Sequence, residues 1–211
     1  DPFHLYCENI MVFNHNIECL HAIEKFIRTY TSKDFWKVHL FDIYTRPKHL
    51  QLCEGAPVIL TANVKGSDTL FNGCTATIVK VDDEGPTIEY KNKHYLLKRH
   101  EFNIFDRKTN QIIATRLQYP LVLGFASTVN RATGLTLDNV VIHAHNMRRP
   151  GQIGTAVGRA RSLDGVQVLN FDPKNCPPHP PIVQDFMDQP GAPVRDDLQC
   201  CSNVCTHRYI L

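Results

Sequence analysis

The residues best suited to chemistry fall in two clusters within residues 118–171. The first cluster, residues 127–136, is polar and contains glycine, so it offers hydroxyls and backbone N–H groups that suit phosphate binding where a helix begins. The second cluster is the arginine pair Arg159 and Arg161. Both clusters are therefore candidates for ligand binding.

The elements that must position these clusters are three apolar runs of strand length, residues 121–126, 140–144 and 166–171. Two polar, glycine-bearing segments of helical length separate the runs, with the arginine pair late in the second segment. This alternation predicts an α/β fold whose parallel sheet is joined by crossover helices. In such sheets ligands collect beyond the carboxyl ends of the strands, close to where the first cluster lies.

The N-terminal part of the chain begins in the same way. Residues 3–7 predict a short strand, and residues 9–30 predict a helix with an apolar stripe that serves core packing: Ile10, Phe13, Ile17, Leu20, Ile23 and Phe26. A weakly alternating strand is expected over residues 35–44, before the break at Arg46-Pro47. A buried strand follows the turn at residues 55–57 and ends near Asn63.

Residues 70–116 have a different, β-rich pattern. Turn-forming sets separate five short runs, which predicts a small β-barrel inserted into the α/β domain; the runs are residues 76–81, 87–90, 94–98, 102–105 and 112–115. Residues 91–116 hold seven lysines and arginines against only Glu101 and Asp106, so one face is locally positive. Two interpretations stay open for it, a solvated surface and contact with a nucleic-acid backbone.

The totals limit the class of protein. A net charge of +2 over 211 residues is too mild to imply a nucleic-acid partner by itself. The apolar runs are too short for a membrane span, so no membrane partner is expected. The eight cysteines follow no disulfide framework, which favours reduced thiols in an intracellular protein. Because the sequence begins with Asp1, it is expected to be a piece of something longer.

The proline-rich segment from residue 173 onward predicts an extended linker or tail, with one short helical turn at residues 182–187. Cys200, Cys201, Cys205 and His207 supply zinc-type ligands, but their spacing matches no standard zinc motif. The favoured interpretation is an exposed, poorly ordered tail, and no metal site is predicted.

Four ordered blocks within residues 3–171 resemble the PIF (petite integration frequency) and RecD type of superfamily-one DNA helicases. The block S-T-V-N-R-A-T-G-L-T-L-D is similar to the family's T-I-H-K-S-Q-G-x-T-L-D, and T-A-V-G-R-A-R-S-L-D-G-V is similar to V-A-L-S-R-A-T-S-L-E-G-L. Upstream, G-A-P-V-I-L-T-A-N-V followed by L-F-N-G resembles the entry to the family's SH3-like insertion. The opening H-L-Y-C-E-N-I-M-V-F-N-H-N resembles the strand and helix that begin the second RecA-like lobe.

The resemblance implies a RecA-like parallel sheet interrupted by an SH3-like β-barrel. Residues 1–69 and 117–172 would form the lobe, residues 70–116 the insertion, and residues 173–211 the tail. In this family ATP lies between two lobes, and the sequence contains no phosphate loop of the form G-x-x-x-x-G-K-S/T. ATP and magnesium would therefore bind only with a missing N-terminal lobe. The implied partners are that lobe and single-stranded DNA, in the nucleus or mitochondrion if the source is eukaryotic.

The resemblance also assigns roles to single residues. Arg159 would be the catalytic arginine finger, because a guanidinium can neutralise the charge that develops on a transferred phosphoryl group. Arg161, Gly134 and Thr136 would join it at the nucleotide. The DNA-backbone contacts would come from Thr128, Asn130, Arg131, Asn63, Lys98 and Arg99. The plainer alternatives are a surface arginine paired with Asp164 or solvent, and an ordinary capped helix start.

Several positions depart from the family pattern. Asn130 and Thr133 replace a histidine and a glutamine, Arg131 replaces a lysine, Gly158 replaces a serine, and Ala76 replaces a glycine. The leading hypothesis is the C-terminal motor lobe of an ATP-dependent DNA helicase. A non-catalytic nucleic-acid-binding module derived from a helicase is the alternative, and a protein-interaction domain is the third.

Overall fold

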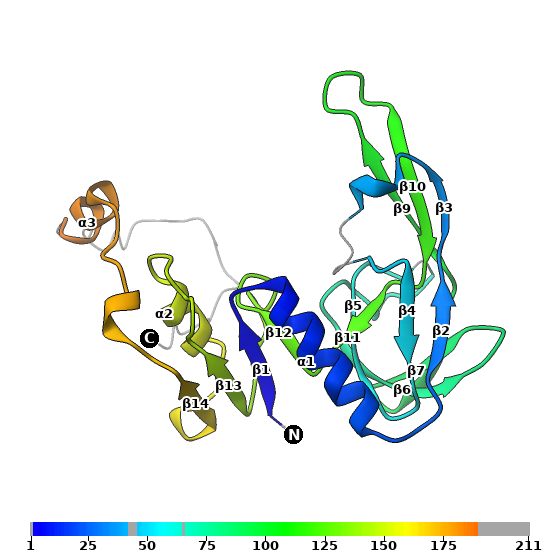
Figure 1. Ribbon diagram of the computed structural model, residues 1–211, viewed down its shortest axis with the longest axis horizontal. Coiled ribbons are helices and arrows are strands. Elements are labelled where there is room, and N and C mark those ends of the chain that lie inside the picture. Colours follow the sequence, from blue (N-terminus) through cyan, green and yellow to red (C-terminus); the bar gives the residue numbers. More distant parts are fainter. Residues whose placement is uncertain (1, 42–45, 65, 190–211) are drawn as a thin grey trace, which may run out of the picture. The chain divides into compact units, whose positions relative to one another are not determined.

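The computed structural model of the chain describes residues 2–41, 46–64 and 66–189 (Figure 1). They fall into two units that divide between Pro177 and Pro178. The first unit contains a parallel sheet and three antiparallel sheets, and the second contains one short helix among its described residues. Each unit is treated by itself below.

The parallel sheet has the strand order β12-β1-β13-β14, with all three neighbouring pairs parallel. Its strands are β1 (Phe3–Tyr6), β12 (Ala126–Thr128), β13 (Val140–His143) and β14 (Val166–Leu169). The inner strands are apolar because side chains are buried on both of their faces: Leu5 and Ile142 lie on one face, and Tyr6 and Val141 lie on the other. The parallel α/β sheet predicted from the apolar runs is confirmed, and its carboxyl ends share one edge.

Helix α1 (Asn9–Ala22) buries one stripe, Val12, Asn16 and Leu20, whose spacing of four residues places them on one face. Val12 packs with Tyr6 and Ala126 at the parallel sheet, whereas Leu20 belongs to the core of the antiparallel region. The expected continuation of this helix to residue 30 is wrong. The helix ends at Ala22, and residues Arg28–Thr31 form strand β2, because they pair with β4 (His49–Leu52) and bury Tyr30 in the antiparallel core.

One of the two predicted crossover helices does not form, and the other is shorter than expected. Between β12 and β13 residues 129–134 are turns, with Gly134 at φ +91°, and Leu137 then pairs with Ala160 in an isolated bridge. The second helix, α2 (Gln152–Val157), has six residues, so Arg159 and Arg161 follow its end and do not lie within it. The bridge explains the early end, because the backbone of Arg159 and Arg161 bonds to Leu137 instead of continuing the helix.

The apolar run of residues 121–126 forms two strands in different sheets. Residues Leu121–Leu123 form β11, which pairs with β5 (Pro57–Leu60) of the antiparallel region, and β12 begins two residues after Gly124. Gly124 is tightly enclosed: its N–H donates to the Pro57 carbonyl at 2.8 Å, and a Cβ there would lie 3.2 Å from the Val58 nitrogen. The chain therefore passes from one sheet to the other at a position that favours glycine.

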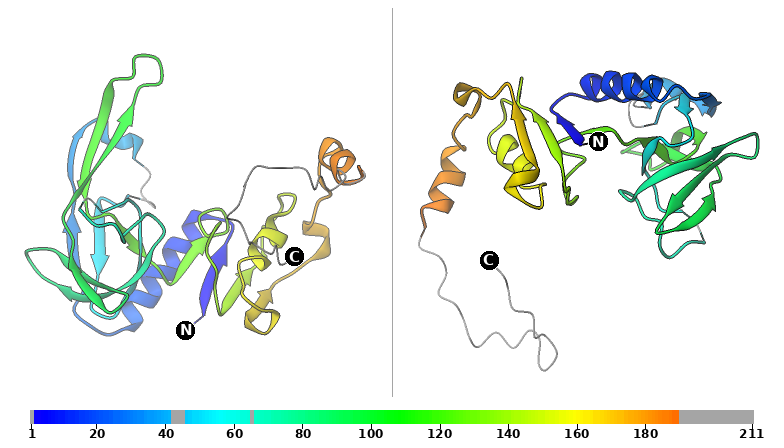
Figure 2. Two further views of the ribbon diagram at one scale, coloured as in Figure 1. Left: turned by 180° about the vertical axis from the view of Figure 1, so that it is seen from behind. Right: turned by 90° about the horizontal axis from the view of Figure 1, so that it is seen from below.

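The antiparallel region contains all five of the predicted short runs. A five-stranded sheet has the order β11-β5-β6-β7-β8, where the new strands are β6 (Thr75–Val81), β7 (Pro86–Tyr90) and β8 (Lys93–Leu96). A three-stranded sheet has the order β3-β10-β9, with β3 (Lys33–Trp36), β9 (His100–Phe105) and β10 (Ile112–Gln118). The third pairs β2 (Arg28–Thr31) with β4 (His49–Leu52); Figure 2 shows these strands from two further directions.

Strands β6 and β10 thus hydrogen-bond to β5 and β3, which lie outside residues 70–116. The strand expected over residues 35–44 is shorter and earlier: β3 ends at Trp36, and the 3-10 helix η1 (Val38–Leu40) follows it. Residues 42–45 lie outside the described residues.

An internal ion pair stabilises the three-stranded sheet. Arg116 of β10 donates from Nε to Asp34 Oδ1 at 2.8 Å and from Nη2 to Oδ2 at 2.7 Å. Their side chains are 5% and 12% exposed. The Arg116 hydrogen bond holds the pKa of Asp34 below its ordinary value, so the carboxylate stays ionised and the two strands are joined by a bidentate contact.

The C-terminal part begins with the 3-10 helices η2 (Leu163–Gly165) and η3 (Pro173–Asn175). In the second unit, the expected short helical turn is present as α3 (Pro181–Met187), none of whose residues is buried. The candidate zinc ligands Cys200, Cys201, Cys205 and His207 lie outside the described residues. Of the tail predicted over residues 173–211, only residues 173–189 are described, and they contain η3 and α3. In residues 2–41, 46–64 and 66–189 no helix is long and apolar enough to cross a membrane.

Candidate nucleic-acid interface

A cavity of about 590 Å³ lies where the loops after β1, β12 and β13 meet. Because these strands are parallel, their carboxyl ends bring the three loops to one edge of the sheet. The lining comes from all three loops and the start of α2: Cys7, Glu8, Asn9, Thr128, Asn130, Arg131, Asn146, Arg148, Arg149 and Gln152. We call this space the strand-end cavity.

The loop after β12 supplies three residues that the sequence singled out. Arg131 donates from Nη2 to Asn9 Oδ1 at 2.6 Å, which joins this loop to the first turn of α1. Thr128 is buried; its Oγ1 accepts from the Arg131 N–H at 3.4 Å, and its carbonyl accepts from Ala132 N–H at 3.0 Å. Asn130 is exposed at the mouth. Thr128 therefore shapes the turn that presents Asn130 and Arg131.

The opposite wall comes from the loops after β1 and β13. Asn146 Nδ2 donates to Glu8 Oε1 at 3.4 Å, and the Arg149 N–H donates to Gln152 Oε1 at 3.4 Å. The Cys7 thiol donates to the His145 carbonyl at 3.4 Å. Burial, followed by the charge of Glu8, raises the pKa of Cys7, so this thiol stays protonated and acts as a hydrogen-bond donor.

The charge of the strand-end cavity is positive. Three arginines, Arg131, Arg148 and Arg149, face it against one carboxylate, Glu8. Guanidinium groups beside amide and hydroxyl side chains are well suited to hold phosphate oxygens. The arrangement can bind an anionic backbone.

The second predicted cluster is assembled by the bridge between residues 137 and 160. The Leu137 N–H donates to the Arg159 carbonyl, and the Arg161 N–H donates to the Leu137 carbonyl, both at 2.8 Å. Leu137, which follows Thr136, is thereby held beside the two arginines. Arg159 Nε donates to the Thr155 carbonyl at 3.1 Å, and Arg161 pairs with Asp138 at 2.6 Å. The alternative pairing of Arg159 with Asp164 is not among the ion pairs of the described residues.

The other predicted DNA-binding residues lie in the antiparallel region. Lys98 is exposed. Asn63 Oδ1 accepts from the Asn72 N–H at 2.9 Å within the connection between β5 and β6. Arg99 points inward: it donates to the Leu117 carbonyl and to Gln118 Oε1, both at 3.2 Å, and its guanidinium lies 4.9 Å from the Tyr119 ring centroid. The structure does not bring these three residues to the strand-end cavity.

Sequence reasoning missed part of the strand-end cavity. Arg148 and Arg149 follow the second apolar run, so the rule applied to the first strand end would have found them. Asn9 carried no such signal, because its position beside Arg131 depends on the pairing of β1 with β12.

A cluster of aromatic and imidazole rings lies between β1, α1 and β13. His4 and His143 are joined through Nδ1 and Nε2 at 2.9 Å, and the His15 ring lies 4.1 Å from the His4 ring between centroids. The Tyr6 hydroxyl contacts His15 Nδ1 at 3.0 Å, and the Tyr6 ring stacks on His143. Burial, with the charges of His15 and His143, lowers the pKa of His4 to about 4. Burial also lowers the pKa of His15 and of His143, so the cluster is neutral near pH 7.

Comparison with known proteins shows which proteins the chain is similar to. No family model matches the chain. The human ATP-dependent DNA helicase PIF1 is 37% identical over 128 residues, which cover 59% of this chain and 20% of that protein. The Xenopus laevis ATP-dependent DNA helicase PIF1 is 30% identical over 150 residues, covering 66% of this chain and 22% of that protein. The chain thus spans about a fifth of the length of these relatives.

The solved structures that resemble the chain are also of Pif1 helicases. A Pif1 helicase from Bacteroides in complex with ADP-AlF3 and ssDNA is 28% identical, with a TM-score of 0.71 over 88% of this chain and 44% of that one. The Pif1 helicase from Candida albicans shares the fold, with a TM-score of 0.76 over 88% of this chain and 49% of that one. In sequence and in fold, the chain is a relative of the PIF1-type DNA helicases.

Proposed function

We propose that the chain is the second RecA-like lobe of an ATP-dependent DNA helicase motor. In this proposal it holds the backbone of single-stranded DNA at the strand-end cavity and presents Arg159 to a nucleotide bound by another lobe. The observation that carries the proposal is the gathering of Asn130 and Arg131 with Arg148 and Arg149 at the carboxyl edge of a parallel sheet. Similarity to helicases, one of which was solved with ADP-AlF3 and ssDNA, supports the same assignment.

The strand-end cavity suits a strand that must slide. Its positively charged groups are guanidiniums, and contacts of guanidiniums with phosphate oxygens carry no sequence information. A motor that moves along DNA requires binding that is similar for every sequence. We therefore assign Arg131, Arg148 and Arg149 to the DNA backbone, with Thr128 as the residue that shapes the turn.

Arg159 is the better of the two arginines for the finger. Its Nε donates to the Thr155 carbonyl, and the side chain is partly exposed. The Nε of Arg161 is instead paired with Asp138, although both side chains are largely exposed. In this proposal ATP and magnesium are held chiefly by the phosphate-loop lobe, with Gly134 and Thr136 beside Arg159 at the cleft. Strands β6 to β10 would correspond to the family's SH3-like insertion.

The DNA assignment is tested by fluorescence anisotropy of the chain with single-stranded oligonucleotides over a range of salt concentrations. For single strands the logarithm of affinity falls with the logarithm of salt by about 0.7 per phosphate neutralised. Replacing Arg131 by Ala should lower this slope by about 0.7, and the Arg148→Ala, Arg149→Ala pair by about 1.4. Arg107→Ala, on the exposed loop of the antiparallel region, should leave the slope unchanged.

A smaller salt slope for Arg107→Ala, with no change for Arg131→Ala, would show that DNA binds to the antiparallel region and not at the strand-end cavity. If the chain showed no salt-dependent binding to single-stranded DNA, the hypothesis of a protein-interaction domain would be favoured instead.

The finger assignment is tested by joining the chain to the phosphate-loop lobe of a PIF1-type relative and measuring DNA-stimulated ATP hydrolysis. Arg159→Ala should lower the turnover number about 1,000-fold, as for other arginine fingers. Arg161→Ala is the matched control and should have a far smaller effect. An Arg159→Ala enzyme with undiminished turnover would show that the finger is another residue.

A further inference from the structure

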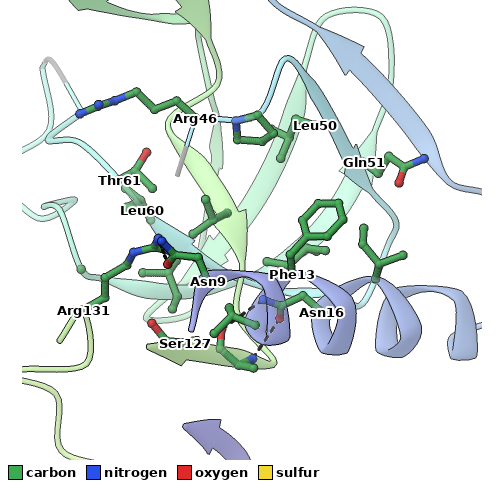
Figure 3. A pocket seen from close by; sticks show the side chains of 18 of the residues that line it. Asn9, Phe13, Asn16, Arg46, Leu50, Gln51, Leu60, Thr61, Ser127 and Arg131 are labelled. Atoms are coloured by element: carbon green, nitrogen blue, oxygen red, sulfur yellow. Dashed lines mark hydrogen bonds between the residues drawn. The ribbon is translucent and has the colours of Figure 1, made fainter. Parts of the chain in front are cut away.

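A second cavity, of about 460 Å³, opens between α1 and the antiparallel region (Figure 3). Its interior is mainly apolar, with contributions from α1, β5, β11 and the turn after β12: Val12, Phe13, Ile17, Leu60, Val122 and Leu135. Phe13 stands on α1 and is 43% exposed. This volume lies within the range of small-ligand sites, which are typically apolar with a few polar groups.

The polar groups of this cavity lie mostly at its rim. His49 and Gln51 of β4 and Asn72 beside β6 are among them, and Asn72 and His49 are exposed. The deeper Asn16 is not available to a ligand, because its side-chain oxygen and nitrogen are used by the backbone of Phe125 and Ala126. The cavity therefore offers apolar and aromatic surface inside and adaptable hydrogen-bonding groups at the entrance.

This mainly apolar cavity, called the apolar cavity below, shares two residues with the strand-end cavity. Asn9 and Arg131 line both the apolar cavity and the strand-end cavity, and they are hydrogen bonded at 2.6 Å. Arg148 and Arg149 lie on the strand-end side of this pair, whereas the other side is mainly apolar, with Arg46 as a further cation in its lining. A nucleotide has a similar division, since its phosphate is anionic and its base has flat π faces with hydrogen-bonding groups at the edges.

We infer that the apolar cavity is a nucleobase pocket, which receives one base of the strand whose phosphates occupy the strand-end cavity. This inference rests on the proposed function and adds to it a contact with a base. Stacking on an aromatic ring accepts every base, because each has a π face. The pocket therefore anchors the strand without reading its sequence, and Phe13 is its stacking residue.

The experiment measures binding of the chain to a single-stranded oligonucleotide of about 12 residues in which one abasic position is moved along the strand. The wild-type chain should bind one of these oligonucleotides about 10-fold more weakly than the intact strand. Phe13→Ala should lower affinity for the intact strand by about the same factor and abolish that contrast. Phe13→Tyr keeps an aromatic ring and should retain the difference in affinity between the intact and the abasic strand.

Met11→Ala is the matched control, because Met11 lies on the same helix, is 45% exposed and does not line the pocket. Equal affinity of the wild-type chain for intact and abasic strands would overturn the base pocket. If Arg131→Ala still lowered the salt slope in that case, the DNA-binding proposal would stand. Equal weakening of intact and abasic strands by Phe13→Ala would also overturn the base pocket. A chain with no salt-dependent binding would remove the proposed function itself.

Discussion

The side chain of Asn16 bonds to both backbone groups of Ala126. Its Oδ1 accepts from the Ala126 N–H at 3.0 Å and from the Phe125 N–H at 3.0 Å, while Nδ2 donates to the Ala126 carbonyl at 3.2 Å. A buried amide thus attaches α1 to the point where the chain enters β12. The strand end that carries Thr128 and Arg131 is positioned by this contact.

Replacing Asn16 by Ala should destabilise the fold by about 2–3 kcal/mol, because buried backbone donors lose their acceptor. The measurement is the free energy of unfolding in urea. Asn14→Ala, at an exposed position of the same helix, is the control and should change stability by less than about 0.5 kcal/mol. Equal effects of the two substitutions would contradict the role given to Asn16.

Gly165→Ala should be strongly destabilising, by about 2 kcal/mol or more, since a Cβ at this position would overlap the Asp138 carbonyl oxygen. The same change would disturb the bridge that positions Arg159 and Arg161. Thermal unfolding provides the measurement. Gly154→Ala is the matched control: its Cβ meets no atom within 4 Å and alanine favours helix, so stability should rise slightly.

Asp34→Asn should cost about 3 kcal/mol, because it leaves Arg116 buried beside a neutral group. Asp34→Asn combined with Arg116→Met should recover much of this loss, since both charges are then removed. Unfolding in urea for the two single variants and the double variant measures the coupling between the side chains. Additive losses would show that the pair contributes no specific interaction.

The histidine cluster predicts a loss of stability in mild acid. The fold lowers the pKa of His4 to about 4 from an ordinary value of 6.5, so between these values the unfolded chain binds more protons. Stability is then greatest above about pH 6.5 and falls as the pH decreases toward about 4. The full difference between the ordinary and the folded pKa of His4 corresponds to about 3 kcal/mol of stability. Solvent screening at this partly exposed site reduces the expected loss to about 1–2 kcal/mol.

Urea unfolding at about pH 7.5 and about pH 4.5 measures this loss. His4→Gln should flatten the pH dependence, and His94→Gln, at an exposed position of β8, should not. The groups around His4 fit the same picture. His15 and His143, which contact His4, have lowered pKa values, whereas burial raises the pKa of Tyr6 and of Cys19, which contact His15, and keeps both protonated. If His4→Gln left the pH dependence of the unfolding free energy unchanged, another group would be responsible for the acid sensitivity.

The sequence predicts features that depend on local pattern. The apolar runs at β1, β13 and β14, the polar cluster after β12 and the short strands β6 to β10 are all visible in it. What it does not predict depends on distant partners. Tyr30 is in a strand because β4 pairs with β2, Gly124 separates two sheets because β5 lies against it, and Asn16 is buried because Ala126 reaches it.

The same limit applies to the strand-end cavity. Thr128, Asn130 and Arg131 could be chosen from their place after an apolar run. Asn9 is brought to them by the parallel register of His4 with Ala126, and no local pattern encodes that register. The sequence predicts longer helices than the fold contains at α1 and α2, because a strand or a bridge uses the backbone groups that a longer helix needs.

The pairing of β1 with β12 and β13 also has a kinetic consequence. His4 and His143 are 139 positions apart, so the parallel sheet closes only after the intervening chain has been drawn together. Most antiparallel strands pair with near neighbours, and local contacts form faster than distant ones. We expect the antiparallel region to fold first and to serve as the template on which the two ends of the parallel sheet meet. During refolding, the edge that carries Arg131 should be the last part of the first unit to gain protection from hydrogen exchange.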